Sequence, residues 1–149
     1  FGAATGVELI PDPCPLPAGI LLAHGDAFCT DDTAYQAARA VLRAPAWQQD
    51  VLARSLAERR ALARQMRAES RAGNANKPEN IMDVNAAEVA RVVAAAGARI
   101  LVHGHTHRPG IHREPWGVRY VLGAWERCAW RLYEDAGTFT LSCRPFVTS

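Results

Sequence analysis

Two short apolar runs in this chain end in the same way, with a histidine followed by a glycine. Residues 20–23 lead into His24-Gly25-Asp26, and residues 100–102 lead into His103-Gly104-His105-Thr106-His107. Each run is bounded by turn residues and is short enough to be a buried strand. Strands that end in histidine deliver imidazoles to the carboxyl edge of a sheet, where α/β proteins usually bind ligands. The two runs therefore predict an α/β fold with histidines from both runs gathered at one sheet edge.

The chemistry of the second turn favours a metal site. Four of the five histidines fall between positions 103 and 112. Histidine is the commonest metal ligand, and Gly104 allows the backbone to approach a bound ion closely. Histidines two apart in an extended turn, as we expect for His105 and His107, can point toward one centre. The competing interpretation is a surface loop that is merely rich in histidine.

The composition is that of a globular protein of one domain. Of the 149 residues, 49% are hydrophobic and 21% are charged, which is ordinary for this class. No apolar run approaches the ~18 residues of a membrane span. The start at Phe1 shows no signal peptide and no initiator methionine, so we expect a fragment or a processed product. Four cysteines without a Cys-x-x-Cys pair predict reduced thiols in or near the core: Cys14, Cys29, Cys128 and Cys143.

Turn and capping residues divide the chain into predicted elements. The proline-rich residues 1–19 form an irregular lead-in that cannot be a central strand. Helices are predicted from Thr33 to Leu42 after a cap at residues 30–32, and from Asn85 to Ala96 after a capping box. One or two amphipathic helices cover about 46–72, and this segment looks like an insertion between two sheet strands. Short strands separated by turn residues predict an antiparallel meander over residues 111–114, 119–122, 128–132 and 138–142.

Positive charge is concentrated in one segment. Between Arg39 and Lys77 there are nine basic and three acidic residues, while the rest of the chain has eight basic and twelve acidic ones. The default interpretation is a solvated arginine face. The excess also suits phosphates or an anionic membrane surface. Nucleic acid is disfavoured as a partner, because only Trp47 interleaves with the arginines as a stacking platform.

The motifs resemble a known family. His24-Gly25-Asp26 and Gly104-His105-Thr106-His107 resemble the second-half signatures of calcineurin-like metallophosphoesterases. Four stretches narrow the resemblance to the UDP-2,3-diacylglucosamine hydrolase family of lipid A biosynthesis: Leu22–Gln36, Ile81–Asn85, His103–Pro109 and Val121–Trp125. Gly-His-x-His is specific only to the superfamily, whereas Cys-Thr-Asp-Asp and Ile-Met-Asp-Val-Asn are more restricted. The resemblance covers nearly the whole chain.

The resemblance implies a four-layer α/β/β/α core with an inserted helical lid. Residues 1–149 would be the C-terminal part of one such domain, with the lid at about 33–80. The implied reaction is manganese-dependent hydrolysis of the pyrophosphate of UDP-2,3-diacylglucosamine, giving UMP and 2,3-diacylglucosamine 1-phosphate (lipid X). A lipid-linked nucleotide of this kind, together with the cysteine usage, places the protein peripherally at the cytoplasmic face of the bacterial inner membrane. There the arginines would contact anionic headgroups.

The resemblance also assigns roles to individual residues. His24 and His105 would bind one Mn²⁺ ion and His107 a second, and such a two-metal site suits pyrophosphate hydrolysis. His105 would also take part in catalysis. Contacts to the substrate are implied for five residues: Asp32, Ser70, Asn74, Lys77 and His105. His103 and His112 match no ligand position and are expected to be structural or to support the ligands from behind. Asp26 is expected either to orient a histidine or to cap a turn.

The sequence departs from the family before the lead-in. The Asp-x-His, Gly-Asp and Gly-Asn-Arg-Asp motifs of the family are absent from these 149 residues. We therefore expect the chain alone to be inactive unless an N-terminal segment or a second chain completes the site. Two alternatives stay open. One is a related metallophosphoesterase acting on another nucleotide diphosphate, and the other is a catalytically incomplete lipid- or metal-binding fragment.

Overall fold

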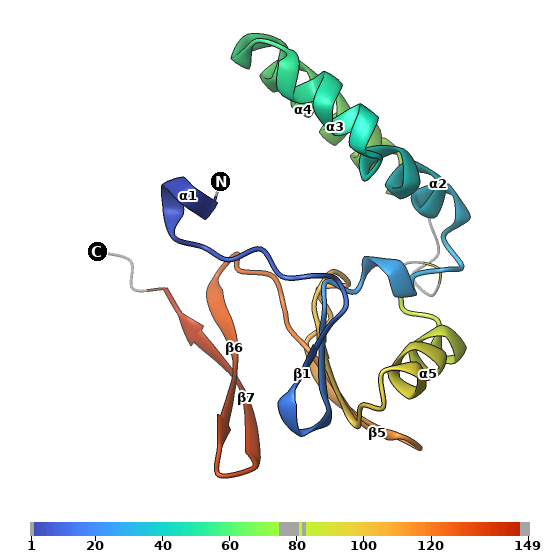
Figure 1. Ribbon diagram of the computed structural model, residues 1–149, viewed down its shortest axis with the longest axis vertical. Coiled ribbons are helices and arrows are strands. Elements are labelled where there is room, and N and C mark those ends of the chain that lie inside the picture. Colours follow the sequence, from blue (N-terminus) through green and yellow to red (C-terminus); the bar gives the residue numbers. More distant parts are fainter. Residues whose placement is uncertain (1, 75–80, 82, 147–149) are drawn as a thin grey trace. The chain divides into compact units, whose positions relative to one another are not determined.

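The computed structural model describes residues 2–74, 81 and 83–146 (Figure 1). The chain divides into two compact units, one from residues 1–28 and 84–149 and the other from residues 29–83. The first unit holds both histidine turns, and the second holds the arginine-rich helices. In the described part of the chain, no helix combines the length and the apolar character that crossing a bilayer requires.

A five-stranded mixed sheet organises the first unit. Its order is β1-β2-β3-β5-β4. The strands are β1 (Cys14–Leu16), β2 (Ile20–Ala23), β3 (Ile100–His103), β4 (Gly110–Glu114) and β5 (Gly117–Val121). The three central strands β2, β3 and β5 are parallel, and β1 and β4 pair antiparallel at the two edges. Both apolar runs are therefore strands, as predicted, and the proline-rich lead-in contributes only an edge strand. Short segments complete the start of the unit: α1 (Gly2–Thr5), η1 (Pro17–Gly19) and η2 (Asp26–Phe28).

The helix α5 (Ala86–Ala95) covers one face of this sheet. Leu21 and Leu101 are paired neighbours on β2 and β3, and both are fully buried in a core cluster with Phe28, Val89 and Val93. The predicted cap is confirmed, because Asn85 Oδ1 accepts a hydrogen bond from the Glu88 backbone N–H at 3.1 Å. Sequestering these apolar side chains from water stabilises the contact between helix and sheet.

A separate hairpin lies on the other face of the sheet. It consists of β6 (Cys128–Asp135) and β7 (Thr138–Pro145), which pair antiparallel. Figure 1 shows α5 and this hairpin on opposite sides of the central strands. The aromatic rings of Tyr120 on β5 and Phe139 on β7 lie 5.6 Å apart between their centroids. The first unit is thus a mixed α/β arrangement of helix, five-stranded sheet and hairpin.

The prediction of one antiparallel meander is wrong. The four strands exist close to the predicted positions, but they form two separate hairpins, β4–β5 and β6–β7. The reason lies in β5, whose two edges are already occupied by β3 and β4. No edge of β5 is left for β6, so the chain leaves the sheet after Val121 and builds its own two-stranded sheet.

The prediction that all four cysteines are reduced is also wrong. Cys128 and Cys143 form a disulfide between β6 and β7, while Cys29 is a buried thiol and Cys14 a half-buried one. The register of the hairpin brings the Cα atoms of Cys128 and Cys143 to 5.8 Å, within the range that a disulfide spans. The spacing along the sequence conceals this proximity.

The second unit consists of helices. Its elements are α2 (Thr33–Leu42), α3 (Pro45–Ala53) and α4 (Leu56–Asn74), which follow β2 and precede β3 in chain order. The predicted cap of α2 is confirmed, because Asp32 Oδ1 accepts from the Tyr35 backbone N–H at 3.0 Å. Ser55 separates α3 from α4, and its hydroxyl donates to Glu58 Oε2 at 2.6 Å. The amphipathic stretch at 46–72 is therefore two helices.

Candidate metal centre

The two histidine turns meet at the carboxyl end of the central strands. Strands β2 and β3 run parallel with Ala23 opposite His103, so the turns that follow them start side by side. The Gly104 N–H donates to the His24 carbonyl oxygen at 3.0 Å. The rings of His24 and His105 then lie 5.0 Å apart between their centroids, at 60° to one another. The structure therefore brings His24 and His105 together, as the matching ends of the two apolar runs predicted.

Asp26 lies beside the ring of His24. His24 Nδ1 is 3.1 Å from Asp26 Oδ1, and the side chain of His24 is 53% exposed whereas that of Asp26 is only 3% exposed. The two atoms are close, but their contact does not have the geometry of a hydrogen bond. Both roles expected for Asp26, orienting a histidine and capping a turn, therefore stay predictions.

Asp12 also belongs to this cluster, although it was not among the predicted site residues. Its Oδ1 accepts a hydrogen bond from the His24 backbone N–H at 3.0 Å. One potential ligand atom from each of Asp12, His24 and Asp26 lies within 4.8 Å of the other two. The pairing of β1 with β2 explains this position, because Cys14 faces Leu22 and continuing that register places Asp12 opposite His24. Antiparallel pairing of the proline-rich lead-in was the signal that could have found it.

The turn that carries His105 and His107 is tighter than expected. The Thr106 N–H donates to the Gly104 carbonyl at 2.8 Å, and His105 and His107 adopt φ values of 64° and 54°. The expectation of an extended turn is therefore wrong, because this short hydrogen bond folds the chain sharply at His105. Left-handed conformations at residues other than glycine cost on the order of 1–3 kcal/mol each and concentrate at functional sites. His107 is exposed on the same turn.

The donor set fits a divalent metal ion. Imidazole nitrogens from the turns after two adjacent strands stand near carboxylate oxygens, and such mixed ligands suit manganese, zinc or iron. Asp12 and Asp26 are the carboxylates that lie within reach of His24. The ligand roles of His24, His105 and His107 nevertheless stay predictions.

The other predicted site residues belong to the second unit. Asp32 is buried and caps α2, Ser70 lies on α4, and Asn74 is the last residue of that helix. Lys77 lies outside the described residues. The contacts of these four with a substrate stay predictions.

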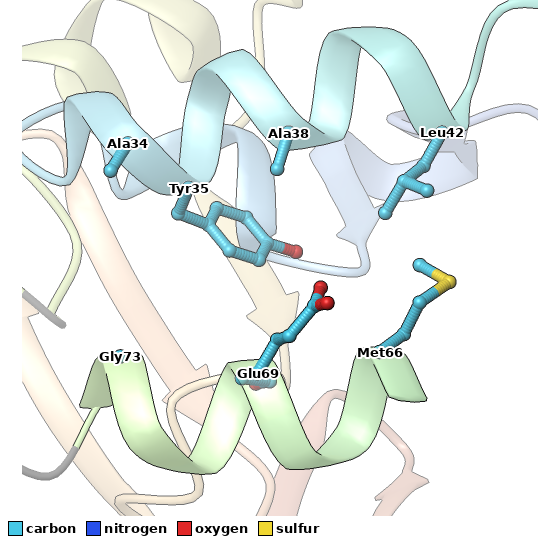
Figure 2. Close-up of a pocket in the computed structure, with 8 residues that line it drawn as sticks. Ala34, Tyr35, Ala38, Leu42, Met66, Glu69 and Gly73 are labelled. Carbon is cyan, nitrogen blue, oxygen red and sulfur yellow. The ribbon is translucent and has the colours of Figure 1, made fainter. Parts of the chain in front are cut away.

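A groove separates α2 from α4 within the second unit. Its volume is ≈ 290 Å³. Figure 2 shows Leu42 and Met66 facing each other at one end, while Tyr35 and Glu69 point toward one another farther along. The walls are mostly small or apolar, with Ser70 and Glu69 as polar members. This lining suits an apolar chain with a polar group at one point.

Comparison with known proteins identifies the family. No protein-family model matches the chain. A protein of Bordetella pertussis named UDP-2,3-diacylglucosamine hydrolase is 47% identical over 134 residues, which are 83% of this chain and 50% of the relative. A protein of Pseudomonas putida with the same name is 44% identical over 157 aligned positions, covering 100% of this chain and 64% of the relative. This chain belongs to the UDP-2,3-diacylglucosamine hydrolase family.

A third member of the hydrolase family, from Cellvibrio japonicus, is 50% identical over 130 residues, which are 83% of this chain and 52% of the relative. The chain therefore spans between about half and two thirds of the length of the UDP-2,3-diacylglucosamine hydrolases that it matches. The predicted resemblance is confirmed by these relatives.

Proposed function

We propose that this chain is the C-terminal part of an enzyme that hydrolyses the pyrophosphate bond of UDP-2,3-diacylglucosamine. The products are UMP and 2,3-diacylglucosamine 1-phosphate. The observation that carries the proposal is the pairing of His24 with His105, 5.0 Å apart, in a chain whose relatives bear the name of this hydrolase. The fold is that of a four-layer α/β/β/α metallophosphoesterase. The stacking of helix α5, the five-stranded sheet and the β6–β7 hairpin supports this proposal.

The histidine turns hold the metal ions. His24 and His105 bind one Mn²⁺ ion, and His107 binds the second. When bound, the ions act as Lewis acids that neutralise the charge developing on the phosphoryl group. Asp26, whose Oδ1 lies 3.1 Å from His24 Nδ1, would orient the ring of His24, and Asp12 holds the backbone of the same residue. His105 would also contact the phosphate of the substrate.

The second unit binds the lipid part of the substrate. An acyl chain enters the groove between α2 and α4, because its lining is mostly apolar and burying methylene groups contributes about 0.8 kcal/mol each. Ser70 lies in the lining and reaches the polar end of the lipid. Asp32 and Asn74 make further polar contacts, and the ammonium of Lys77 pairs with a phosphate oxygen.

The arginines of α4 hold the protein peripherally at the cytoplasmic face of the inner membrane. Five arginines lie on this helix, at positions 59, 60, 64, 67 and 71. Each basic side chain near an anionic surface contributes roughly 1 kcal/mol. Such contacts would keep the enzyme close to a substrate whose acyl chains reside in the bilayer.

Activity of the full-length polypeptide with competing ligands tests this function. We expect UMP release from UDP-2,3-diacylglucosamine in the presence of Mn²⁺, with little inhibition by UDP alone, because a lipid-selective site gains most of its binding energy from the acyl chains. The His105→Ala variant should lose this activity. His112→Ala is the matched control, since His112 is exposed on β4 and should behave like the wild type.

Three results would contradict the proposal. Near-normal turnover in His105→Ala would contradict the role of His105 as a Mn²⁺ ligand. Equal competition by UDP and the acylated nucleotide would instead favour an enzyme that acts on another nucleotide diphosphate. Binding of lipid X without turnover by the full-length protein would identify a lipid-binding module without hydrolytic activity.

A further inference from the structure

His103 lies behind the two histidine turns and contacts both of them. It is the last residue of β3 and only 1% exposed. We propose that His103 is a positioning residue for the metal centre: its ring holds both turns in place through its contacts with Gly104 and Gly25, and Arg119 anchors the ring. The inference rests on the proposed function only in taking these turns to be the metal-binding ones.

The first contact joins His103 to the turn that carries His105. His103 Nδ1 lies 3.0 Å from the carbonyl oxygen of Gly104. A carbonyl oxygen only accepts hydrogen bonds, so the proton of this pair must be on Nδ1. The same oxygen accepts from the Thr106 N–H at 2.8 Å. The Gly104 carbonyl oxygen is therefore the acceptor that closes the turn at His105, and His103 contacts the same oxygen from the core side.

The second contact joins His103 to the turn that carries His24. A Cβ atom added to Gly25 would lie 2.9 Å from His103 Nδ1 and 3.0 Å from the Gly104 oxygen. The ring of His103 therefore packs directly against the Gly25 backbone. Gly25 also has a φ of 109°, which side-chain-bearing residues rarely adopt. The buried ring of His103 thus contacts both turns, the one that carries His24 and the one that carries His105.

The third contact holds the ring from the opposite side. Arg119 Nη1 lies 3.4 Å from His103 Nε2. Because a guanidinium has donors but no acceptor, Nε2 must present its lone pair, which agrees with the proton on Nδ1. Arg119 is itself held by Glu114, whose Oε1 accepts from Arg119 Nε at 3.1 Å. The Arg119 side chain is 12% exposed.

The registers of the strands explain why His103, Arg119 and Glu114 form a row on one face of the sheet. Leu101 pairs with Arg119 across β3 and β5, and His103 is two residues beyond Leu101 on the same face. Gly117 pairs with Glu114 across β5 and β4, so Glu114 is a diagonal neighbour of Arg119 on that face. Phe28 closes the row, with its ring edge-on to His103 at 6.0 Å. The surroundings thus favour one tautomer and one ring position.

The alternative tautomer would be doubly unfavourable. With the proton on Nε2, an N–H group would face the cationic guanidinium of Arg119. At the same time the lone pair of Nδ1 would face the Gly104 carbonyl oxygen. Buried polar groups without a suitable partner cost about 1–3 kcal/mol each. The geometry therefore links the tautomer of His103 to the position of the Gly104 carbonyl, and through it to His105.

Nitrogen NMR of the full-length protein tests the tautomer directly, without any need for turnover. We expect the ring of His103 to show a protonated Nδ1 and an unprotonated Nε2. The Arg119→Met variant removes one of the two contacts that favour this tautomer while leaving His103 in place, and should raise the population of the Nε2-protonated ring. A ring protonated on Nε2 in the wild type would overturn the proposal, as would an Nε2-protonated population that does not rise in Arg119→Met.

Calorimetric titration with Mn²⁺ tests the positioning role. His103→Leu fills the site in the core with an apolar side chain but removes the hydrogen bond to the Gly104 carbonyl oxygen. It should weaken Mn²⁺ binding about 10–100-fold, as the loss of hydrogen bonds that support metal ligands does at other metal sites. Leu101→Ala is the matched control, because Leu101 is buried on the same strand and face but distant from the turn. Leu101→Ala should lower the free energy of unfolding, because it removes buried carbon atoms and leaves a cavity. The Mn²⁺ affinity of the folded variant should stay within about twofold of that of the wild type.

The two arms separate this proposal from the proposed function. Equal Mn²⁺ affinity in His103→Leu and wild type would overturn the positioning role. If His103→Leu fails to fold, Arg119→Met takes its place in the titration and must weaken Mn²⁺ binding for the proposal to stand. A protein that binds Mn²⁺ through these turns and shows the expected tautomer, yet releases no UMP from UDP-2,3-diacylglucosamine, would support the role of His103 and contradict only the proposed reaction.

Discussion

Replacing Gly25 with alanine should destabilise the protein through two separable effects. The first is conformational, because Gly25 has a φ of 109° and left-handed backbone costs an L-residue roughly 1–2 kcal/mol. Alanine offsets about 0.4–1 kcal/mol of this by restricting the unfolded chain. The second effect is steric, since the new Cβ would lie 2.9 Å from His103 Nδ1 and 3.0 Å from the Gly104 oxygen. Overpacking of this kind costs about 1–3 kcal/mol.

Gly97→Ala is the matched control for the conformational effect. Gly97 follows α5 with a φ of 62°, and a Cβ placed there would have no atom within 4 Å. Its replacement should therefore cost about 1 kcal/mol or less, from backbone strain alone. The difference between the two variants isolates the steric effect, which should amount to about 1–3 kcal/mol.

Urea unfolding of the full-length protein, followed by circular dichroism, measures this difference. With a slope of about 2 kcal/mol per molar urea, a difference of about 2 kcal/mol moves the midpoint by roughly 1 M. The Gly25→Ala variant should unfold at the lower urea concentration. Equal midpoints for Gly25→Ala and Gly97→Ala would refute the close packing of His103 against Gly25.

Three further perturbations have expected outcomes. Leu101→Ala should lower the free energy of unfolding by about 2–5 kcal/mol, because Leu101 is fully buried; a loss below 1 kcal/mol would contradict the core described above. Cys128→Ser, measured without reductant, should lower the free energy of unfolding by about 3 kcal/mol relative to the wild type, because the bridge closes a loop with a sequence separation of 15. An unchanged free energy of unfolding, or no change in the mass of the wild type on reduction, would exclude the disulfide. The hydrogen bonds from the Ser55 side chain and backbone hold the pKa of Glu58 below its ordinary value, so their contribution to helix stability is complete above the ordinary carboxyl range and is lost as the pH falls through the folded-state pKa. Thermal melts of Glu58→Gln should show less loss of helix stability between pH 6 and pH 3 than the wild type, and parallel profiles would contradict this cap.

The sequence predicted the centre of the fold better than its edges. The apolar runs at 20–23 and 100–102 became adjacent parallel strands, because their composition requires burial on both faces. The meander failed because edge pairing depends on which strand edges are already occupied. That information is not local, and it becomes visible only when β5 is seen between β3 and β4.

The same distinction applies to the candidate site. His24 and His105 were predictable, since each lies within two residues of the end of a strand whose position was clear. Asp12 was missed because its proximity to His24 arises from the β1–β2 register, which the proline-rich composition of the lead-in concealed. The bond between Cys128 and Cys143 depends in the same way on the register of a hairpin.

The sequence also contains a local signal for the start of α4. Ser55-x-x-Glu58 is a complete capping box, in which Glu58 Oε2 accepts from the Ser55 N–H at 2.8 Å and the Glu58 N–H donates to the Ser55 hydroxyl at 3.3 Å. This motif alone predicts the start of a helix. Its use would have placed the boundary between α3 and α4 within the arginine-rich segment.

The most direct test of the account is UMP release from UDP-2,3-diacylglucosamine by the full-length polypeptide, measured with and without Mn²⁺. The wild type and His24→Ala are compared, since His24 is the residue on which Asp12, Asp26 and His105 converge. The account predicts Mn²⁺-dependent release of UMP by the wild type and release at the background level by His24→Ala. Equal release by both proteins, or release that is indifferent to the metal, would contradict it.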